Sequence, residues 1–209
     1  MTQLGTALMR ANRFEEAVEL LMPLLAMYRA QGNYRHAPKI RLNLMCNIAC
    51  CLMNLDRLED AVTIEREVFS GMVSEYGDRS VETLSCVYNF SMSLAKTGNV
   101  AEAKSLLQKY VPIAQDFLGE EAELPLTLQQ GYVTLHGDYY ESAEDLDYAR
   151  RMLEDLCRTF QRVLGANHPR TLELEISRER IAKTEEGFLA ENARLAAAAA
   201  PQRSWCVVS

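Results

Sequence analysis

A Thr-Leu pair recurs at a constant spacing along the sequence. It stands at residues 83–84, 127–128 and 171–172, so successive copies begin 44 residues apart. Each copy opens a run in which apolar residues return every three or four positions, as they do on one face of a helix. A fixed period of this length is typical of solenoids, in which each repeat stacks on the previous one.

The repeating unit is clearest between Asp78 and Gly119. Its first apolar pattern begins at Thr83 and stops at Gly98-Asn99, and its second runs from Ala103 to Leu118. Glycine tolerates the backbone conformation with positive φ that ends many helices. We therefore predict that each repeat is a pair of antiparallel helices joined by a short turn.

This unit can be followed along most of the chain, although its copies differ in length. The first helix of the first copy is short, and the fourth copy is two residues longer, with a lengthened turn expected around Gly137-Asp138 and Ser142 as the cap of its return helix. The predicted borders are roughly 1–32, 37–77, 78–119 and 120–165, followed by an extra helix over 169–185, its continuation over 186–200 and a flexible tail over 201–209.

An apolar residue recurs at every seventh position of the extra helix, at Leu174, Ile181, Phe188 and Leu195. Most positions between them are charged or polar. A coiled coil needs two apolar positions in every seven. We therefore expect this stripe to dock the helix on the preceding repeat as a C-terminal cap, and not to drive dimerisation.

Composition and charge narrow the possible partners. Hydrophobic residues make up 48% and charged residues 24% of the chain, which excludes a largely disordered protein, and the net charge of −7 argues against nucleic acid. A cationic or neutral partner suits the chain better. No apolar run is long enough to span a membrane and no secretion signal opens the sequence, so a cytoplasmic protein is expected.

Several short motifs resemble the tetratricopeptide repeats of kinesin light chains. The run FQRVLGANHPRTLELE has the Leu-Gly end, the His-Pro turn and the Thr-Leu restart of those repeats, and Asn47-Ile48-Ala49 with Glu59-Asp60-Ala61 matches the Asn-Leu-Ala and Glu-Ala elements. The resemblance covers residues 1 to about 185. It implies an all-α fold, a right-handed α-α superhelix of about four helix pairs plus the capping helix.

The resemblance also implies a groove lined by the first helix of each pair, which accepts an extended peptide or a partner helix. Asparagine amides there can pair with a peptide backbone whatever its side chains, and Met and Tyr supply adaptable apolar contact. By the resemblance, the groove-facing residues are Asn43, Cys46, Asn47, Cys50, Met53 and Asn54 in the second repeat, and Ser85, Tyr88, Asn89, Met92 and Lys96 in the third.

Structural explanations compete with these assignments. Asn47 and Asn89 could instead satisfy backbone groups between adjacent helices. Cys46, Cys50 and Cys51 are closely spaced on one predicted helix, but no further metal ligands lie nearby in the sequence. We expect them to be small core residues, with no metal and no cofactor bound.

No motif for catalysis is present. The sequence lacks His-Glu-x-x-His, a Gly-rich phosphate loop and Gly-x-Ser-x-Gly, and its three histidines lie in different turns or helix ends. The predicted function is therefore a non-catalytic scaffold that binds a protein or peptide. The alternative is an architectural fragment of a larger adaptor, whose groove is idle or filled by its own terminal helix.

The last four residues, Cys206-Val207-Val208-Ser209, fit the Cys-aliphatic-aliphatic-X pattern of a prenylation signal. A terminal Ser favours a farnesyl group on Cys206. No polybasic segment accompanies the motif, and a single lipid chain anchors weakly. Membrane association is expected only if Cys206 is prenylated.

Overall fold

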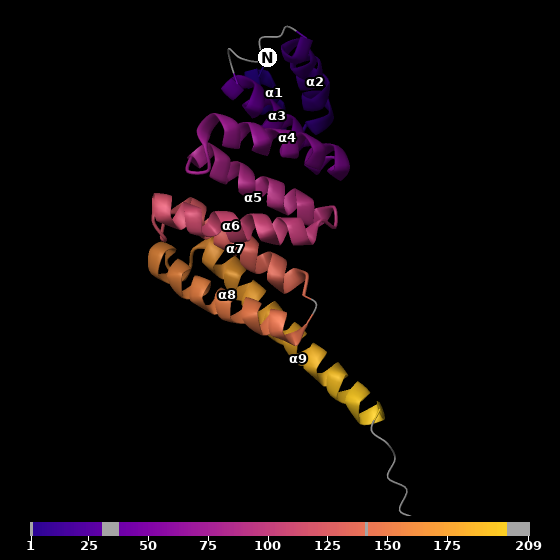
Figure 1. The fold of residues 1–209 in the computed structure, drawn as a ribbon, viewed down its shortest axis with the longest axis vertical. Coiled ribbons are helices and arrows are strands. Elements are labelled where there is room, and N and C mark those ends of the chain that lie inside the picture. The colour runs from indigo at the N-terminus through magenta and orange to yellow at the C-terminus, as the bar shows by residue number, and fades with distance from the viewer. Residues whose placement is uncertain (1, 31–37, 141, 200–209) are drawn as a thin grey trace, which may run out of the picture. The chain divides into compact units, whose positions relative to one another are not determined.

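A computed structural model describes residues 2–30, 38–140 and 142–199 of the chain. This described part is helical throughout and contains no strand, so the predicted all-α fold class is confirmed (Figure 1). No helix in it is both long and apolar enough to cross a membrane. Its helices are α1 (Thr2–Arg10), α2 (Phe14–Ala30), α3 (Pro38–Asn54), α4 (Leu58–Tyr76), α5 (Val81–Lys96), α6 (Val100–Leu118), α7 (Glu123–Asp138), α8 (Ala143–Leu164) and α9 (Pro169–Ala199).

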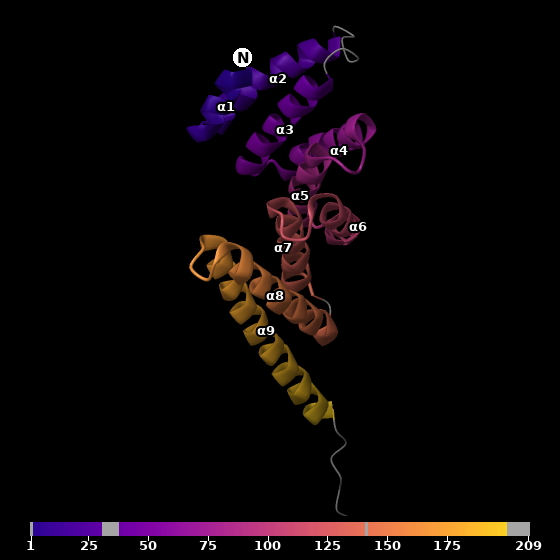
Figure 2. The same cartoon turned by 90° about the vertical axis from the view of Figure 1, so that its left-hand side faces the viewer.

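The helices form two compact units, Met1–Leu135 and His136–Ser209. In the first unit each helix from α1 to α6 packs against its neighbours in the sequence, so the pairs follow one another in chain order (Figures 1 and 2). In the second unit α8 and α9 lie side by side. Packing between sequence neighbours is the arrangement expected of a helical solenoid.

A small residue marks the same position of the second helix in every pair. The alanines there have no exposed surface, which lets the two helices of a pair approach closely. These alanines are Ala17, Ala61, Ala103 and Ala149.

The helix ends follow the turn chemistry expected from the sequence. Ser80 caps α5 by accepting a hydrogen bond of 3.1 Å from the Thr83 backbone N–H. Ser142 and Asp145 form a capping box at the start of α8. Gly119 ends α6 with a φ of 90°, a value that a residue with a side chain rarely adopts.

The turn of the fourth repeat lies later than predicted. Gly137 and Asp138 were expected in this turn, but both belong to the last turn of α7. The reason for the glycine is close packing, because a Cβ atom at Gly137 would lie 2.3 Å from Cδ1 of Ile181 in α9. Gly137 therefore marks a place where one helix closely approaches another, and not the expected chain reversal.

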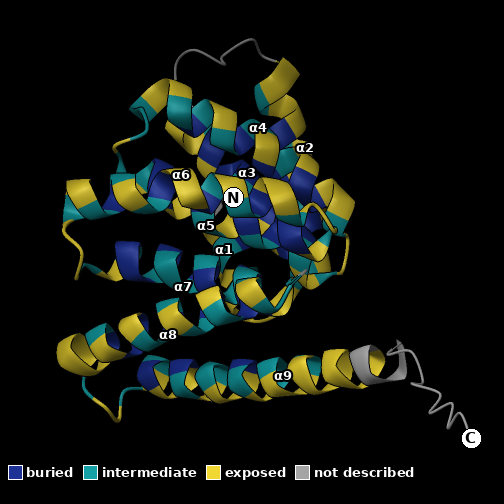
Figure 3. Cartoon of the chain, turned by 60° about the horizontal axis from the view of Figure 1, so that its bottom comes forward, coloured by how far each residue is buried: buried dark blue, intermediate teal, exposed yellow. Residues whose placement is uncertain are grey.

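Helix α9 docks through the first part of its apolar stripe. Leu174 and Ile181 are buried, whereas Leu195 is 60% exposed. In Figure 3 the start of α9 carries buried residues and its far end is mostly exposed. Arg150 in α8 donates a hydrogen bond of 3.1 Å to Glu185, which adds a polar contact to the same interface. The helix therefore covers α8 as a cap. The prenylation motif at Cys206 and the tail over 201–209 lie outside the described residues.

Candidate functional site

The eleven residues predicted to face a groove lie on α3 and α5, both within the first unit. None of them is buried. Buried residues such as Leu44, Ile48, Leu84 and Val87 alternate with them along the two helices. Four of the eleven nevertheless pack against the hydrophobic core, and they are Cys46, Met53, Tyr88 and Met92. Exposed are Asn43, Cys50, Asn54, Ser85, Asn89 and Lys96, and partly exposed are Cys46, Asn47, Met53, Tyr88 and Met92.

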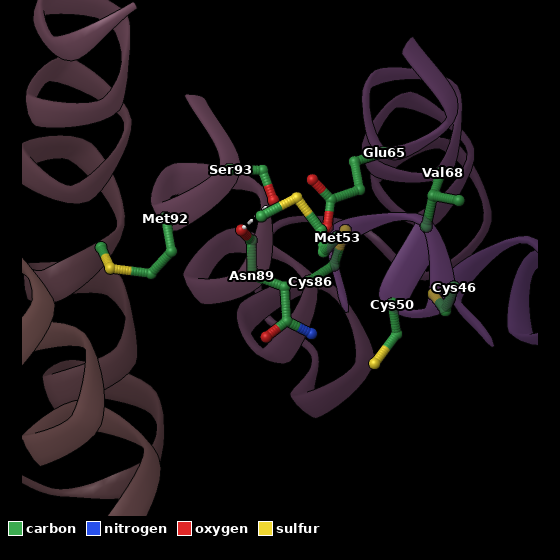
Figure 4. Close-up of a pocket in the computed structure, with 9 residues that line it drawn as sticks. All are labelled: Cys46, Cys50, Met53, Glu65, Val68, Cys86, Asn89, Met92 and Ser93. Carbon is green, nitrogen blue, oxygen red and sulfur yellow. Dashed lines mark hydrogen bonds between the residues drawn. The ribbon is translucent and has the colours of Figure 1, made fainter. Parts of the chain in front are cut away.

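Five of these residues line one pocket between the second and third repeats (Figure 4). Its volume is about 190 Å³, which is below the size of most sites for drug-like ligands and closer to that of one long side chain. The pocket brings together Cys46, Cys50 and Met53 of α3 with Asn89 and Met92 of α5. The remaining six predicted residues lie outside it.

Four further lining residues were not predicted. Glu65 and Val68 lie one turn apart on α4, and Cys86 and Ser93 lie on α5. The groove expected from the sequence involves only the first helix of each pair, whereas α4, a second helix, also contributes to the pocket. The pocket is therefore built by three consecutive helices.

The asparagines of the site differ in what they contact. The amide of Asn54 donates a hydrogen bond of 2.8 Å to the backbone oxygen of Cys50 in its own helix. The amides of Asn47 and Asn89 form no hydrogen bond with any residue in the described part of the chain. These two amides therefore do not satisfy backbone groups of neighbouring helices within the described part of the chain.

Tyr88 and Met92 contact the next helix along the array. A Cβ atom at Gly131 of α7 would lie 3.1 Å from Cε2 of Tyr88 and 3.3 Å from Cε of Met92. The glycine thus makes room for both side chains. These two residues form the wall of the site nearest α7, while Met53 forms the wall on α3.

The thiols of the pocket stay protonated near neutral pH. Burial raises the pKa of Cys46 to about 11 and also raises the pKa of Cys50 and Cys86. The Glu65 carboxylate lies close enough to raise all three further. Protonated thiols are poor nucleophiles, so these cysteines line the pocket as small, polarisable surfaces.

Glu65 is the acidic residue of the pocket, and its buried carboxyl group has few hydrogen-bond partners. Only 7% of the residue is exposed, and its Oε2 atom accepts no hydrogen bond from the described residues. Burial raises the pKa of Glu65, and the Ser93 hydroxyl partly offsets this by stabilising the charged form. The carboxylate and the Ser93 hydroxyl reach the same part of the pocket, beside the Met53 side chain (Figure 4).

The neighbouring cations on α3 and α4 form pairs elsewhere. Arg41 lies 3.0 Å from a carboxylate oxygen of Glu67, and Arg66 donates two hydrogen bonds to Glu102 on α6. Both arginines therefore have carboxylate partners other than Glu65. Among the described residues, no ion pair involves Glu65.

The repeat pattern shows how unusual Glu65 is. It stands four positions after the buried alanine of its helix, and the same position in the other three pairs carries a leucine that is at most 2% exposed. Aligning the repeats by their alanines would have revealed this difference from the sequence alone. The corresponding leucines are Leu21, Leu107 and Leu153.

Metal binding does not account for the cluster. Within residues 2–30, 38–140 and 142–199, no three or more His, Cys, Asp or Glu side chains converge so that they could hold a metal ion.

The sequence matches a known repeat family over part of its length. The model of the family described as Tetratricopeptide repeat matches residues 1–30 and 137–170. These stretches cover the first helix pair and the region from the end of α7 to the start of α9. No curated protein matches the sequence.

Solved structures share the fold over nearly the whole chain. A putative kinesin light chain from Podosopora anserina with nearly identical TPR-like repeats has a TM-score of 0.72 and 18% identity, covering 96% of this chain and 95% of that one. A single-substitution variant of that protein has a TM-score of 0.68 and 19% identity, covering 92% and 94%. BtubC (BKLC) from P. vanneervenii has a TM-score of 0.71 and 16% identity, covering 99% and 84%.

Proposed function

We propose that this chain, a tetratricopeptide-repeat protein whose repeats resemble those of kinesin light chains, is a non-catalytic scaffold that binds an extended peptide or a partner helix along α3 and α5. Solenoids of this type present the first helices of successive pairs as one continuous binding surface. A protein partner, and not a small-molecule substrate, is the expected ligand.

One observation supports this proposal most strongly. Asn47 and Asn89 lie at the predicted groove positions of α3 and α5, and their amides form no hydrogen bond within the described residues. A side-chain amide can donate to a peptide carbonyl and accept from a peptide N–H. Two such amides on consecutive repeats would fix a peptide main chain, while Met53 and Met92 adapt to its side chains.

The proposal is tested with peptides selected from a display library of random linear sequences against the full chain. Replacing both amides, Asn47→Ala with Asn89→Ala, should weaken the binding of the selected peptides roughly tenfold or more, because each peptide hydrogen bond contributes about 1 kcal/mol. The melting temperature should stay within a few degrees of the wild-type value. Gln108→Ala, an exposed amide on α6, serves as the matched control.

Two outcomes would contradict the proposal. If no peptide is enriched on the wild-type chain, the alternative of an architectural fragment with an idle or self-filled groove is favoured, and deletion of residues 186–209 then tests self-filling by asking whether peptides are enriched. If the double alanine variant unfolds, the asparagines have a structural role.

A further inference from the structure

We infer that the pocket around Glu65 recognises a single lysine or arginine side chain of the bound peptide. This inference rests on the proposed function, because it places one residue of the peptide in one pocket of the same groove. It also names the chemical group by which the chain would select its partner. The acceptor is the Glu65 carboxylate, and the ligand group is a cation carried on a flexible apolar stem.

A buried carboxylate at position 65 is unfavourable for the fold. A buried ionised carboxylate without a charged partner is unfavourable, and the same position of the repeat is a buried leucine in the other three pairs. The fold therefore does not need an acid there. A ligand cation would supply the partner that Oε2 lacks among the described residues.

The size and lining of the pocket suit a lysine or arginine side chain. Its volume of about 190 Å³ has room for one long side chain. Met53, Val68 and Met92 line it with apolar surface, on which the methylene stem of a lysine or arginine can pack. The exposed Asn89 amide lies at the same pocket and can bind the adjoining peptide backbone.

The charges of the lining residues and of the whole chain also favour a cationic ligand. The other titratable groups that line the pocket are Cys46, Cys50 and Cys86, and burial raises the pKa of all three, so they are neutral near pH 7. Glu65 is thus the one group among the nine lining residues that can carry a negative charge near pH 7, and none of these residues is a cation. The net charge of the whole chain, −7, also favours the approach of a cationic peptide.

The experiment uses the full chain and the display library of random linear peptides. We expect the selected peptides to share one Lys or Arg at a fixed position. Changing this residue to norleucine or citrulline, which removes the charge, should weaken binding about 10- to 100-fold, the usual range for a charge-assisted hydrogen bond. These changes are made in the peptide, so they leave the folding of the protein unaffected.

Protein variants supply the second arm. Glu65→Gln and Glu65→Leu should weaken binding of the same peptides by a similar factor without lowering the melting temperature. Glu65→Leu restores the residue found in the other repeats. Glu75→Gln removes an exposed carboxylate from the same helix and should leave binding unchanged.

The two proposals fail in different ways. Selected peptides that bind through the asparagines but need no cation, or that bind Glu65→Gln as tightly as wild type, would overturn the Glu65 inference and leave the scaffold proposal standing. Enrichment of no peptide at all would overturn both. A cation-dependent peptide that loses its binding on Glu65→Gln, but not on Glu75→Gln, would support both.

Discussion

Helices α4 and α6 occupy the same place in consecutive repeats, yet their cores differ at one position. Leu107 of α6 is fully buried in an apolar cluster with Leu84 and Leu94. Its counterpart in α4 is Glu65, which is nearly as buried but lines a pocket. A leucine at this position serves the packing of the repeat. The carboxylate that replaces it in the second repeat is not required for that packing.

The largest effect is expected from copying the carboxylate into the repeat that lacks the site. Leu107→Glu should lower the free energy of unfolding by roughly 3–5 kcal/mol, because it removes a core leucine and buries a charge without a partner. Chemical denaturation measures the change. Gln108→Glu, which adds the same charge at an exposed neighbouring position, should change stability by less than about 0.5 kcal/mol.

A small effect of Leu107→Glu would weaken the comparison. It would mean that this position accepts a carboxylate in any repeat, so that the presence of Glu65 carries no functional information. The pocket beside Glu65 would then be only a consequence of the packing of α3, α4 and α5.

The sequence predicted the fold better than the site. Apolar periodicity and the glycines located the helices closely, because each signal is local and recurs in every repeat. Gly137 was misread because its role depends on Ile181, a residue of another helix that the local pattern does not reveal. The groove residues on α3 and α5 came from the resemblance, and their role in binding stays a prediction.

Glu65 was missed for a different reason. Carboxylates at helical spacing ordinarily lie on a solvated helix face, so the local pattern around Glu65 does not mark it as buried. Only the alignment of Glu65 with Leu21, Leu107 and Leu153 shows that it lies on the core side of its helix. The pocket itself could not be predicted, because it depends on how side chains of three helices leave space between them.

A buried polar group that has a partner provides the opposite case within the third repeat. Tyr110 is 1% exposed, and its hydroxyl donates a hydrogen bond to Asp78, which lowers the pKa of that carboxyl group. Tyr110→Phe should therefore cost about 1 kcal/mol of stability and return the pKa of Asp78 toward its ordinary value. Thermal unfolding and NMR titration of the aspartate measure the two effects.

The Tyr110 and Glu65 substitutions are expected to change stability in opposite directions. Removing the polar group of Tyr110 should destabilise the protein because the group has a partner, whereas removing the charge of Glu65 should stabilise it. A stabilised Tyr110→Phe variant would show that buried polar groups of this array are unfavourable whether or not they are paired.

The pH dependence of stability shows whether the ionised Glu65 carboxylate destabilises the fold or stabilises it. Burial raises the pKa of Glu65 in the folded chain above its value in the unfolded chain, so the folded state binds the proton more tightly. The stability contributed by this group is present below the unfolded pKa and is lost as pH rises through the folded pKa. Burial raises the pKa of Cys46 to about 11 and also raises the pKa of Cys86, so neither thiol titrates near the ordinary value for glutamate.

The most direct measurement is the difference in unfolding free energy between Glu65→Gln and the wild-type chain as a function of pH. We expect the variant to be more stable at pH 7, by roughly 1–3 kcal/mol, with a difference that shrinks as pH falls toward the ordinary value for glutamate. A variant that is less stable than the wild-type chain at pH 7 would contradict the account, because Glu65 would then stabilise the fold.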